Sequence, residues 1–116
     1  MPKHKMQWSL KVRFWVEGDG VKVLGPGRVE LLGHIDRKRS ISAAAKQMGM
    51  SYRRAWSLVT AMNESADAPL VELAAGGAGG GGATLTSRGK DAIALYRRIG
   101  ARFARVAAEL EAGSLG

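Results

Sequence analysis

Residues 42–56, SAAAKQMGMSYRRAW, predict two short helices on either side of a tight turn. Ala45 is small enough to let the two helix backbones cross closely, and Gly49 supplies the left-handed backbone conformation that the turn needs. Ser51 is a favourable cap for the second helix, because its hydroxyl can accept a hydrogen bond from a free backbone N–H. Three further side chains complete the pattern, one filling the turn and two facing the first helix: Met50, Ala55 and Leu58. The spacing therefore predicts a helix-turn-helix.

The second of these helices has the sequence SYRRAWSLVTAMNES and is predicted to bury one face. Steps of three, four and three residues predict a buried stripe formed by Tyr52, Ala55, Val59 and Met62. The opposite face carries Arg53, Ser57 and Thr60, with Arg54 on one flank and Trp56 on the other. Arginine can donate two hydrogen bonds to guanine, and Ser and Thr can bond bases or phosphates. The helix is therefore expected to enter a DNA major groove, and a solvated basic face is the alternative.

The chain around this motif predicts one small domain over residues 1–116. Apolar residues alternate from Trp8 to Val16, and Gly18-Asp19-Gly20 favours a turn, so the chain is expected to begin with a β-hairpin. The expected elements are a hairpin over 7–24, a helix over 26–38, the helix-turn-helix over 41–64, a wing over 70–86 and a helix over 87–112. The fold class is thus mainly α with small β (α+β), a winged helix-turn-helix.

Two segments are open to more than one interpretation. The glycine run GGAGGGG joins two strand-like segments and lacks the Lys-Ser/Thr of a phosphate-binding loop, so nucleotide binding is disfavoured. As the tip of a wing it could bind DNA phosphates through backbone N–H groups such as those of Gly79 and Gly80, or it could be a flexible spacer. The basic run at 37–39 could stabilise the end of a helix or contact DNA.

The last predicted helix has apolar residues at heptad spacing. The repeat consists of Ala92 followed by the expected dimerisation residues Tyr96, Ile99, Phe103, Val106 and Leu110. One small core cannot cover so long a stripe, which favours packing against a second copy of the chain. Burial against the N-terminal hairpin is the alternative.

Composition narrows the function classes. The net charge is +8 and the isoelectric point is about 10.5, which favours a polyanionic partner such as double-stranded DNA. Cysteine is absent, and His4 and His34 have no carboxylate or histidine partner at ligand spacing, so we expect neither a metal site nor catalytic residues. An enzyme is accordingly disfavoured. No signal peptide or membrane span is visible, and a cytoplasmic location without membrane partners is expected.

The chain resembles the N-terminal, LysR-like winged helix-turn-helix domain of the ModE family of molybdate-responsive transcriptional regulators. The resemblance rests on GRVELLGHIDRKRSISAAAKQMGMSYRRAWSLVTAMN, PLVE, the glycine run and TLTSRGKDAIALYRRI, which occur in this order over nearly the whole chain. It implies a homodimer that binds a palindromic operator near molybdate-transport genes. The expected DNA-binding residues are Ser42, Gln47, Ser51, Tyr52, Arg53, Arg54, Ser57, Thr60, Gly79, Gly80 and Arg88.

The sequence departs from this family at its C-terminal end. Full-length members carry molybdate-binding Mop domains, and no sequence for one follows Gly116. We therefore expect no bound cofactor and no molybdate site in these residues. Either the chain is a short form controlled by a separate effector-sensing partner protein or by its own abundance, or the effector region lies outside this sequence. A non-specific architectural DNA-binding protein is the main alternative function, and a protein-interaction module with incidental basic charge is another.

Overall fold

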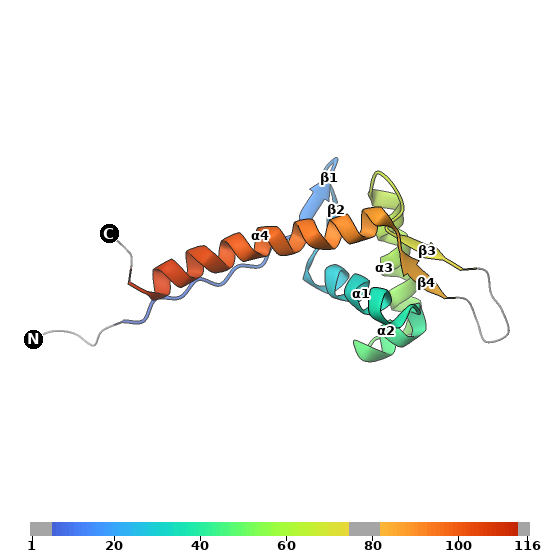
Figure 1. The fold of residues 1–116 in the computed structure, drawn as a ribbon, viewed down its shortest axis with the longest axis horizontal. Coiled ribbons are helices and arrows are strands. Elements are labelled where there is room, and N and C mark those ends of the chain that lie inside the picture. The colour runs from blue at the N-terminus through green and yellow to red at the C-terminus, as the bar shows by residue number, and fades with distance from the viewer. Residues whose placement is uncertain (1–5, 75–81, 114–116) are drawn as a thin grey trace, which may run out of the picture.

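The protein is a winged helix-turn-helix from which one long helix projects (Figure 1). The computed structural model describes residues 6–74 and 82–113. Its elements are β1 (Val16–Gly18), β2 (Val21–Leu24), α1 (Pro26–Lys38), α2 (Ile41–Gln47), α3 (Tyr52–Ser65), β3 (Val71–Leu73), β4 (Ala83–Leu85) and α4 (Ser87–Glu111). Each pair of strands forms a two-stranded antiparallel sheet, β1 with β2 and β3 with β4. The predicted α+β class is confirmed.

Three of the helices begin with a side-chain cap. The hydroxyl oxygens of Ser40, Ser51 and Thr86 accept hydrogen bonds of 3.1, 3.1 and 3.0 Å from the backbone N–H three residues later, at the starts of α2, α3 and α4. Each bond satisfies one of the N–H groups that a helix start leaves without a partner. Ser51 was the predicted cap of its helix, and this prediction is confirmed.

The end of α1 ties the helix-turn-helix to the wing. Arg39 adopts a left-handed conformation with φ of 55°, and its N–H donates to the carbonyl oxygen of Ile35 at 2.7 Å. The carbonyl oxygen of Arg39 accepts a 3.1 Å hydrogen bond from the N–H of Ala83, the first residue of β4. The backbone at the start of β4, the second strand of the wing, is therefore fixed against the turn that precedes α2.

The core lies between α1, α2, α3 and the base of the wing. Its largest fully buried side chains are Leu31, Leu32, Ile35, Val59, Met62 and Leu70. Burial of each such side chain stabilises the fold by about 1.5–3 kcal/mol before conformational entropy is counted. Because α3 supplies two of these side chains, the orientation of its opposite face is set by the core.

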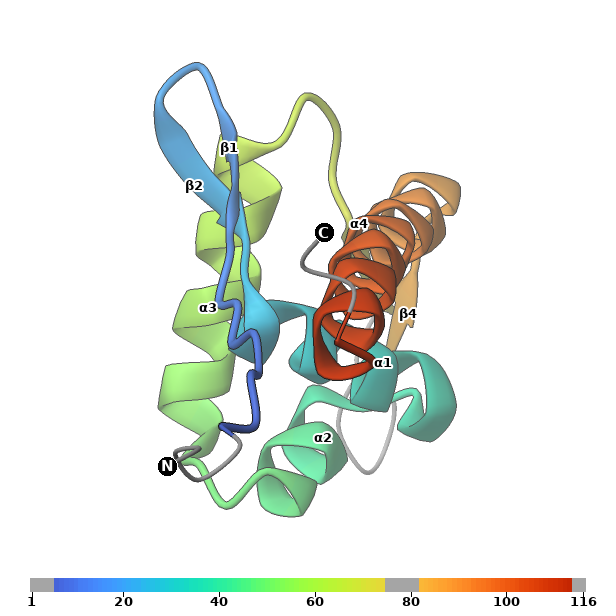
Figure 2. The same ribbon diagram turned by 90° about the vertical axis from the view of Figure 1, so that its left-hand side faces the viewer.

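The predicted N-terminal strand is mostly absent. Strand β1 begins only at Val16, and residues 6–15 extend without regular structure toward the same end of the molecule as the C-terminal half of α4 (Figures 1 and 2). Trp8 and Val12, expected on a half-buried strand, are 50% and 42% exposed. A strand needs a neighbour for its backbone groups, and β2 is only four residues long before Gly25 and Pro26 start α1. The hairpin over 7–24 is therefore corrected to 16–24.

Candidate nucleic-acid interface

The turn between α2 and α3 has the geometry that the sequence predicted. Gly49 has a positive φ of 66°, and the N–H of Met50 donates to the carbonyl oxygen of Ala45 at 3.0 Å. Ala45 and Ala55 are 2% and 0% exposed, as expected where two helices cross closely. The structure thus holds the first turn of α3 rigidly at one end of the molecule, the lower end in Figure 2.

The outward face of α3 is basic. Arg53, Arg54 and Ser57 are exposed on its first two turns, and together with Ser51 and Leu58 they line a shallow hollow of about 350 Å³. Ser51 is exposed as well, although its hydroxyl already accepts the capping bond from Arg54. Arginine side chains on the first turn of an exposed helix can enter a major groove and donate to base edges.

Other predicted residues lie around this face. Ser42 and Gln47 are exposed near the two ends of α2, and Thr60 is half-buried one turn beyond Ser57. Gly79 and Gly80 lie outside the described residues. The basic run at 37–39 is exposed at the end of α1, directly before α2, where long cationic side chains can reach a phosphate backbone as well as the helix end.

Tyr52 does not belong to the buried stripe of α3. Its side chain is 54% exposed, whereas Ala55, Val59 and Met62 are fully buried as predicted. Tyr52 is the first residue of α3, and helical side chains point toward the N-terminus of their helix, so its ring projects past the helix start. There it stacks on Trp56, with ring centroids 6.4 Å apart.

Trp56 was absent from the predicted binding residues. It is 41% exposed and lies in a hollow of about 340 Å³ that it forms with Tyr52 and Arg53. Its position one step around the helix from Arg53 is visible in the sequence. The sequence pattern places Trp56 on one flank of the polar face, and this position beside Arg53 is the signal that marks it.

Arg88, one of the residues expected to bind DNA, forms an ion pair with Asp67. Its Nε and one terminal nitrogen donate to the two carboxylate oxygens of Asp67 at 3.0 and 2.8 Å. The hydrogen bond from Arg88 is the main cause that lowers the pKa of Asp67 from its ordinary value of 3.8. Asp67 follows the C-terminal end of α3, about 20 Å along the helix from its first turn. The guanidinium of Arg88 therefore lies near the C-terminal end of α3, and Arg53 and Arg54 are at its other end.

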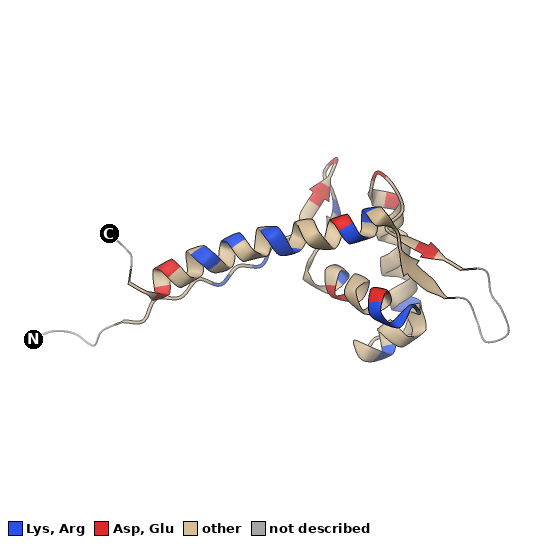
Figure 3. Ribbon diagram, in the orientation of Figure 1, with Lys and Arg blue, Asp and Glu red and all other residues tan. Residues whose placement is uncertain are grey.

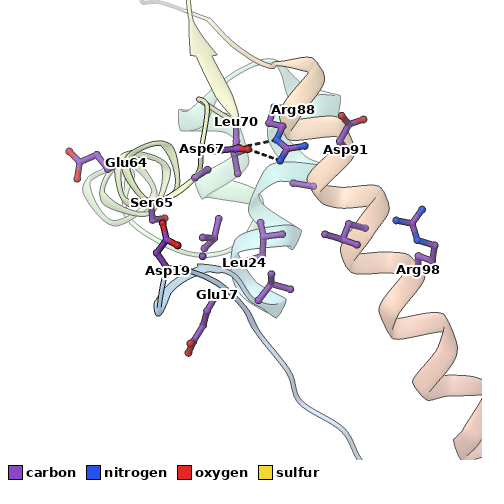
Figure 4. Close-up of a pocket in the computed structure, with 16 residues that line it drawn as sticks. Glu17, Asp19, Leu24, Glu64, Ser65, Asp67, Leu70, Arg88, Asp91 and Arg98 are labelled. Atoms are coloured by element: carbon purple, nitrogen blue, oxygen red, sulfur yellow. Dashed lines mark hydrogen bonds and ion pairs between the residues drawn. The ribbon is translucent and has the colours of Figure 1, made fainter.

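The pair of Asp67 and Arg88 belongs to an acidic groove of about 630 Å³ between β1, the end of α3 and the start of α4 (Figure 4). Five of the ten acidic residues of the chain line it: Glu17, Asp19, Glu64, Asp67 and Asp91. Carboxylates repel a phosphate backbone. In Figure 3, Lys and Arg instead mark the end of α1 and much of α4. The uneven charge thus favours DNA at the α2–α3 end and disfavours it at the groove.

Residues 6–74 and 82–113 contain no group of three or more His, Cys, Asp and Glu side chains that could hold a metal ion. Within the same ranges, no helix is long and apolar enough to cross a membrane. The Nδ1 atom of half-buried His34 accepts a 3.0 Å hydrogen bond from Arg37. Its Nε2 atom lies 3.8 Å from a carboxylate oxygen of Glu30, one helical turn earlier, so the expectation that His34 has no carboxylate neighbour is wrong.

Comparison with known proteins places this helix-turn-helix in a family. Over 88 residues the chain is 48% identical to the molybdenum-pterin-binding protein MopB of Rhodobacter capsulatus. These aligned residues make up 76% of this chain and 33% of MopB. The chain is 49% identical over 71 residues to the DNA-binding transcriptional dual regulator ModE of Escherichia coli, covering 61% of this chain and 27% of ModE. The molybdenum transport protein ModE of Azotobacter vinelandii is 40% identical to the chain over 87 residues, which make up 75% of this chain and 32% of that ModE.

The chain thus spans about a third of the length of these curated relatives. The resemblance to ModE proteins that the sequence motifs predicted is confirmed over this part. Residues 27–90, from the start of α1 to the first turn of α4, match the model of the bacterial regulatory helix-turn-helix proteins of the lysR family. This match contains the whole helix-turn-helix and both wing strands, and the chain belongs to that family.

Proposed function

We propose that this protein is a sequence-specific transcriptional regulator that binds an inverted repeat in DNA as a homodimer and controls molybdenum-related genes. The observation that carries the proposal is the exposure of Arg53, Arg54 and Ser57 on the first two turns of α3. A bidentate contact from one arginine to guanine contributes about 1–3 kcal/mol of discrimination between bases. Ser42 and Gln47, exposed on α2, are suitably placed to bond the phosphate backbone.

The second half of α4 supports the homodimer. Helix α4 has 25 residues and is about 37 Å long, and none of its residues after Tyr96 is buried. Phe103 and Val106 are 38% and 52% exposed, and they continue the heptad repeat with Ile99 and Leu110. A second copy would remove this apolar stripe from water, which contributes about 25 cal/mol per Å².

Tyr96 is left out of this dimer surface. It is 7% exposed and packs against Phe14 of the same chain, which leaves it little surface for a partner. For Tyr96, the alternative to dimerisation given by the sequence, burial against the N-terminal part of the same chain, is what the structure has. The proposed dimer stripe therefore consists of Ile99, Phe103, Val106 and Leu110.

A twofold dimer of this kind would present two copies of α3 to the DNA. Reading helices in successive major grooves lie about 34 Å apart, and twofold symmetry requires the two half-sites to be inverted. The link to molybdenum rests on the relatives, which are named for molybdenum-pterin binding and molybdenum transport. We propose that a separate effector-sensing partner protein is one means of control.

The test is selection of bound sequences from a random DNA duplex pool, with competition at two salt concentrations. We expect an enriched inverted repeat, and Arg53→Ala is expected to weaken binding to it by about 1–3 kcal/mol while relaxing the preference at one base pair. Lys90→Ala removes one positive charge from the exposed start of α4 and serves as the control, with the preference unchanged. A pool without enriched sequences and with a steep salt dependence would overturn the proposal in favour of an architectural protein.

A further inference from the structure

The first two turns of α3 carry an exposed aromatic surface beside the arginines. Tyr52 and Trp56 are 54% and 41% exposed, and their rings stack with centroids 6.4 Å apart and planes 25° apart. Neither ring packs against the hydrophobic core, unlike Met50 and Leu58 on the neighbouring turns. The two rings are one helical turn apart, so they form one continuous apolar surface.

This surface adjoins Arg53, one of the two arginines that the proposed function assigns to base reading. Tyr52, Arg53 and Trp56 line one hollow of about 340 Å³. Trp56 lies about 60° around the helix from Arg53, so both side chains face the same groove when α3 enters it. Arg53 and Arg54 make the surroundings of the rings cationic, which complements DNA better than an apolar protein partner.

We propose that Tyr52 and Trp56 contact the 5-methyl groups of thymine in the major groove, so that α3 selects thymine beside the guanine read by arginine. Thymine is the base that presents a methyl group in this groove, and apolar side chains are what recognise it. Removing both the rings and the methyl group from water supplies the selectivity. This inference rests on the proposed function, because it requires an operator that α3 reads.

Replacement of thymine by uracil tests the contact directly, because it removes the methyl group and keeps every hydrogen-bonding group of the base. Each thymine of the selected operator is replaced singly, and the dissociation constant of the unaltered protein is measured. We expect one or two positions in each half-site to lose about fourfold in affinity, which is the ~0.8 kcal/mol of one buried methyl group.

The residues are assigned by repeating the titration with Trp56→Ala. This variant should bind the thymine operator more weakly, and at one or more of the sensitive positions it should bind thymine and uracil equally well. Trp15→Ala is the matched control, since Trp15 is also an exposed tryptophan, at 56%, but lies outside α3. It should keep the fourfold preference for thymine. Circular dichroism checks that both variants are folded, and Tyr52→Ala gives a second variant of the aromatic surface.

The outcomes separate this inference from the proposed function. An operator that is bound specifically through Arg53 but shows no loss at any uracil position would overturn the thymine contact alone. An unchanged methyl preference in Trp56→Ala would also overturn it. If Trp56→Ala had no effect on any DNA, the aromatic surface would belong to a protein contact. A random pool without any enriched sequence would overturn both.

Discussion

The hydroxyl of Tyr96 donates a 2.7 Å hydrogen bond to the backbone carbonyl oxygen of Phe14, and the rings of the two residues stack with centroids 4.3 Å apart. Tyr96 is the last buried residue of α4, and every residue that follows it in the helix is exposed or half-buried. Phe14 also contacts Phe103, at a centroid distance of 5.2 Å. Phe14 therefore fixes the N-terminal segment to α4 and covers part of the helix that the core does not reach.

Tyr96→Phe keeps the ring stack and removes the hydrogen bond. The carbonyl oxygen of Phe14 loses its partner, so we expect the free energy of unfolding to fall by about 1 kcal/mol in a denaturant titration. Tyr52→Phe is the control, because Tyr52 is more than half exposed and its hydroxyl is accessible to water. It should leave the free energy of unfolding unchanged.

The same residue should make the free energy of unfolding depend on pH in the alkaline range. Burial raises the pKa of Tyr96 above its ordinary value of 10.0. Because the folded state holds the proton more tightly, this contribution to stability is complete below pH 10 and is lost as the pH rises through the pKa of the folded state. The stability difference between the unaltered protein and Tyr96→Phe should therefore shrink above about pH 10. A difference that stays constant to higher pH would contradict this assignment.

Two glycines of α4 should respond in opposite directions to the same substitution. A Cβ on Gly89 would overlap the carbonyl oxygen of Leu70, which accepts a hydrogen bond from the N–H of Thr86. A Cβ on Gly100 would meet only ring atoms of Phe14, at 3.9 Å. Gly89→Ala should therefore destabilise the protein by about 1–3 kcal/mol or more. Gly100→Ala should raise the melting temperature, since alanine is favoured over glycine in a helix by about 1 kcal/mol.

The parts of the fold that depend on local sequence could be predicted. Gly49 and Ser51 form the turn and the cap that their chemistry favours, and α1 spans Pro26–Lys38 where the pattern placed it. These features need only neighbours a few residues away. The predicted outward side of α3 is right for the same reason, because the buried positions Ala55, Val59 and Met62 leave that side exposed.

The features that the sequence could not predict depend on partners far away in the chain. The alternation from Trp8 to Val16 is typical of a strand, but the length of β2 decides how much of it is paired. Arg88 was expected to bind DNA, because its sequence neighbours do not reveal that its guanidinium forms an ion pair with Asp67, 21 residues earlier. Tyr96 likewise matches the heptad repeat in sequence, but in the structure it is covered by Phe14, 82 residues earlier.

The ion pair of Asp67 and Arg88 predicts a small acid-dependent contribution to stability. The pKa of Asp67 is lowered, so the contribution is present above pH 3.8 and is lost as the pH falls through the pKa of the folded state. Because both side chains are exposed, solvent screens the pair and the effect is modest. Unfolding curves of the unaltered protein and Asp67→Asn should differ at about pH 5 and converge at about pH 2. Unfolding curves that differ equally at both pH values would contradict a stabilising ion pair between Asp67 and Arg88.

Asn63 links α3 to the wing through three hydrogen bonds. Its side-chain oxygen accepts from the N–H groups of Leu70 and Val71 at 2.9 and 3.1 Å, and its amide nitrogen donates to the carbonyl oxygen of Val71 at 3.0 Å. Leu70 and Val71 are each 2% exposed, so water does not readily replace these bonds.

Asn63→Leu would leave two N–H groups and one carbonyl oxygen without partners, at about 1–3 kcal/mol for each unsatisfied buried group. We expect a strongly lowered melting temperature and faster hydrogen exchange at the amides of Leu70 and Val71. Asn63→Asp keeps the accepting oxygens, so those two amides should stay protected although the bond to the Val71 carbonyl is lost. Glu64→Ala, at the exposed neighbouring position, is the control. If the two amides exchanged equally fast in Asn63→Asp and Asn63→Leu, the side-chain oxygen of Asn63 would not be what fixes the start of β3 to α3.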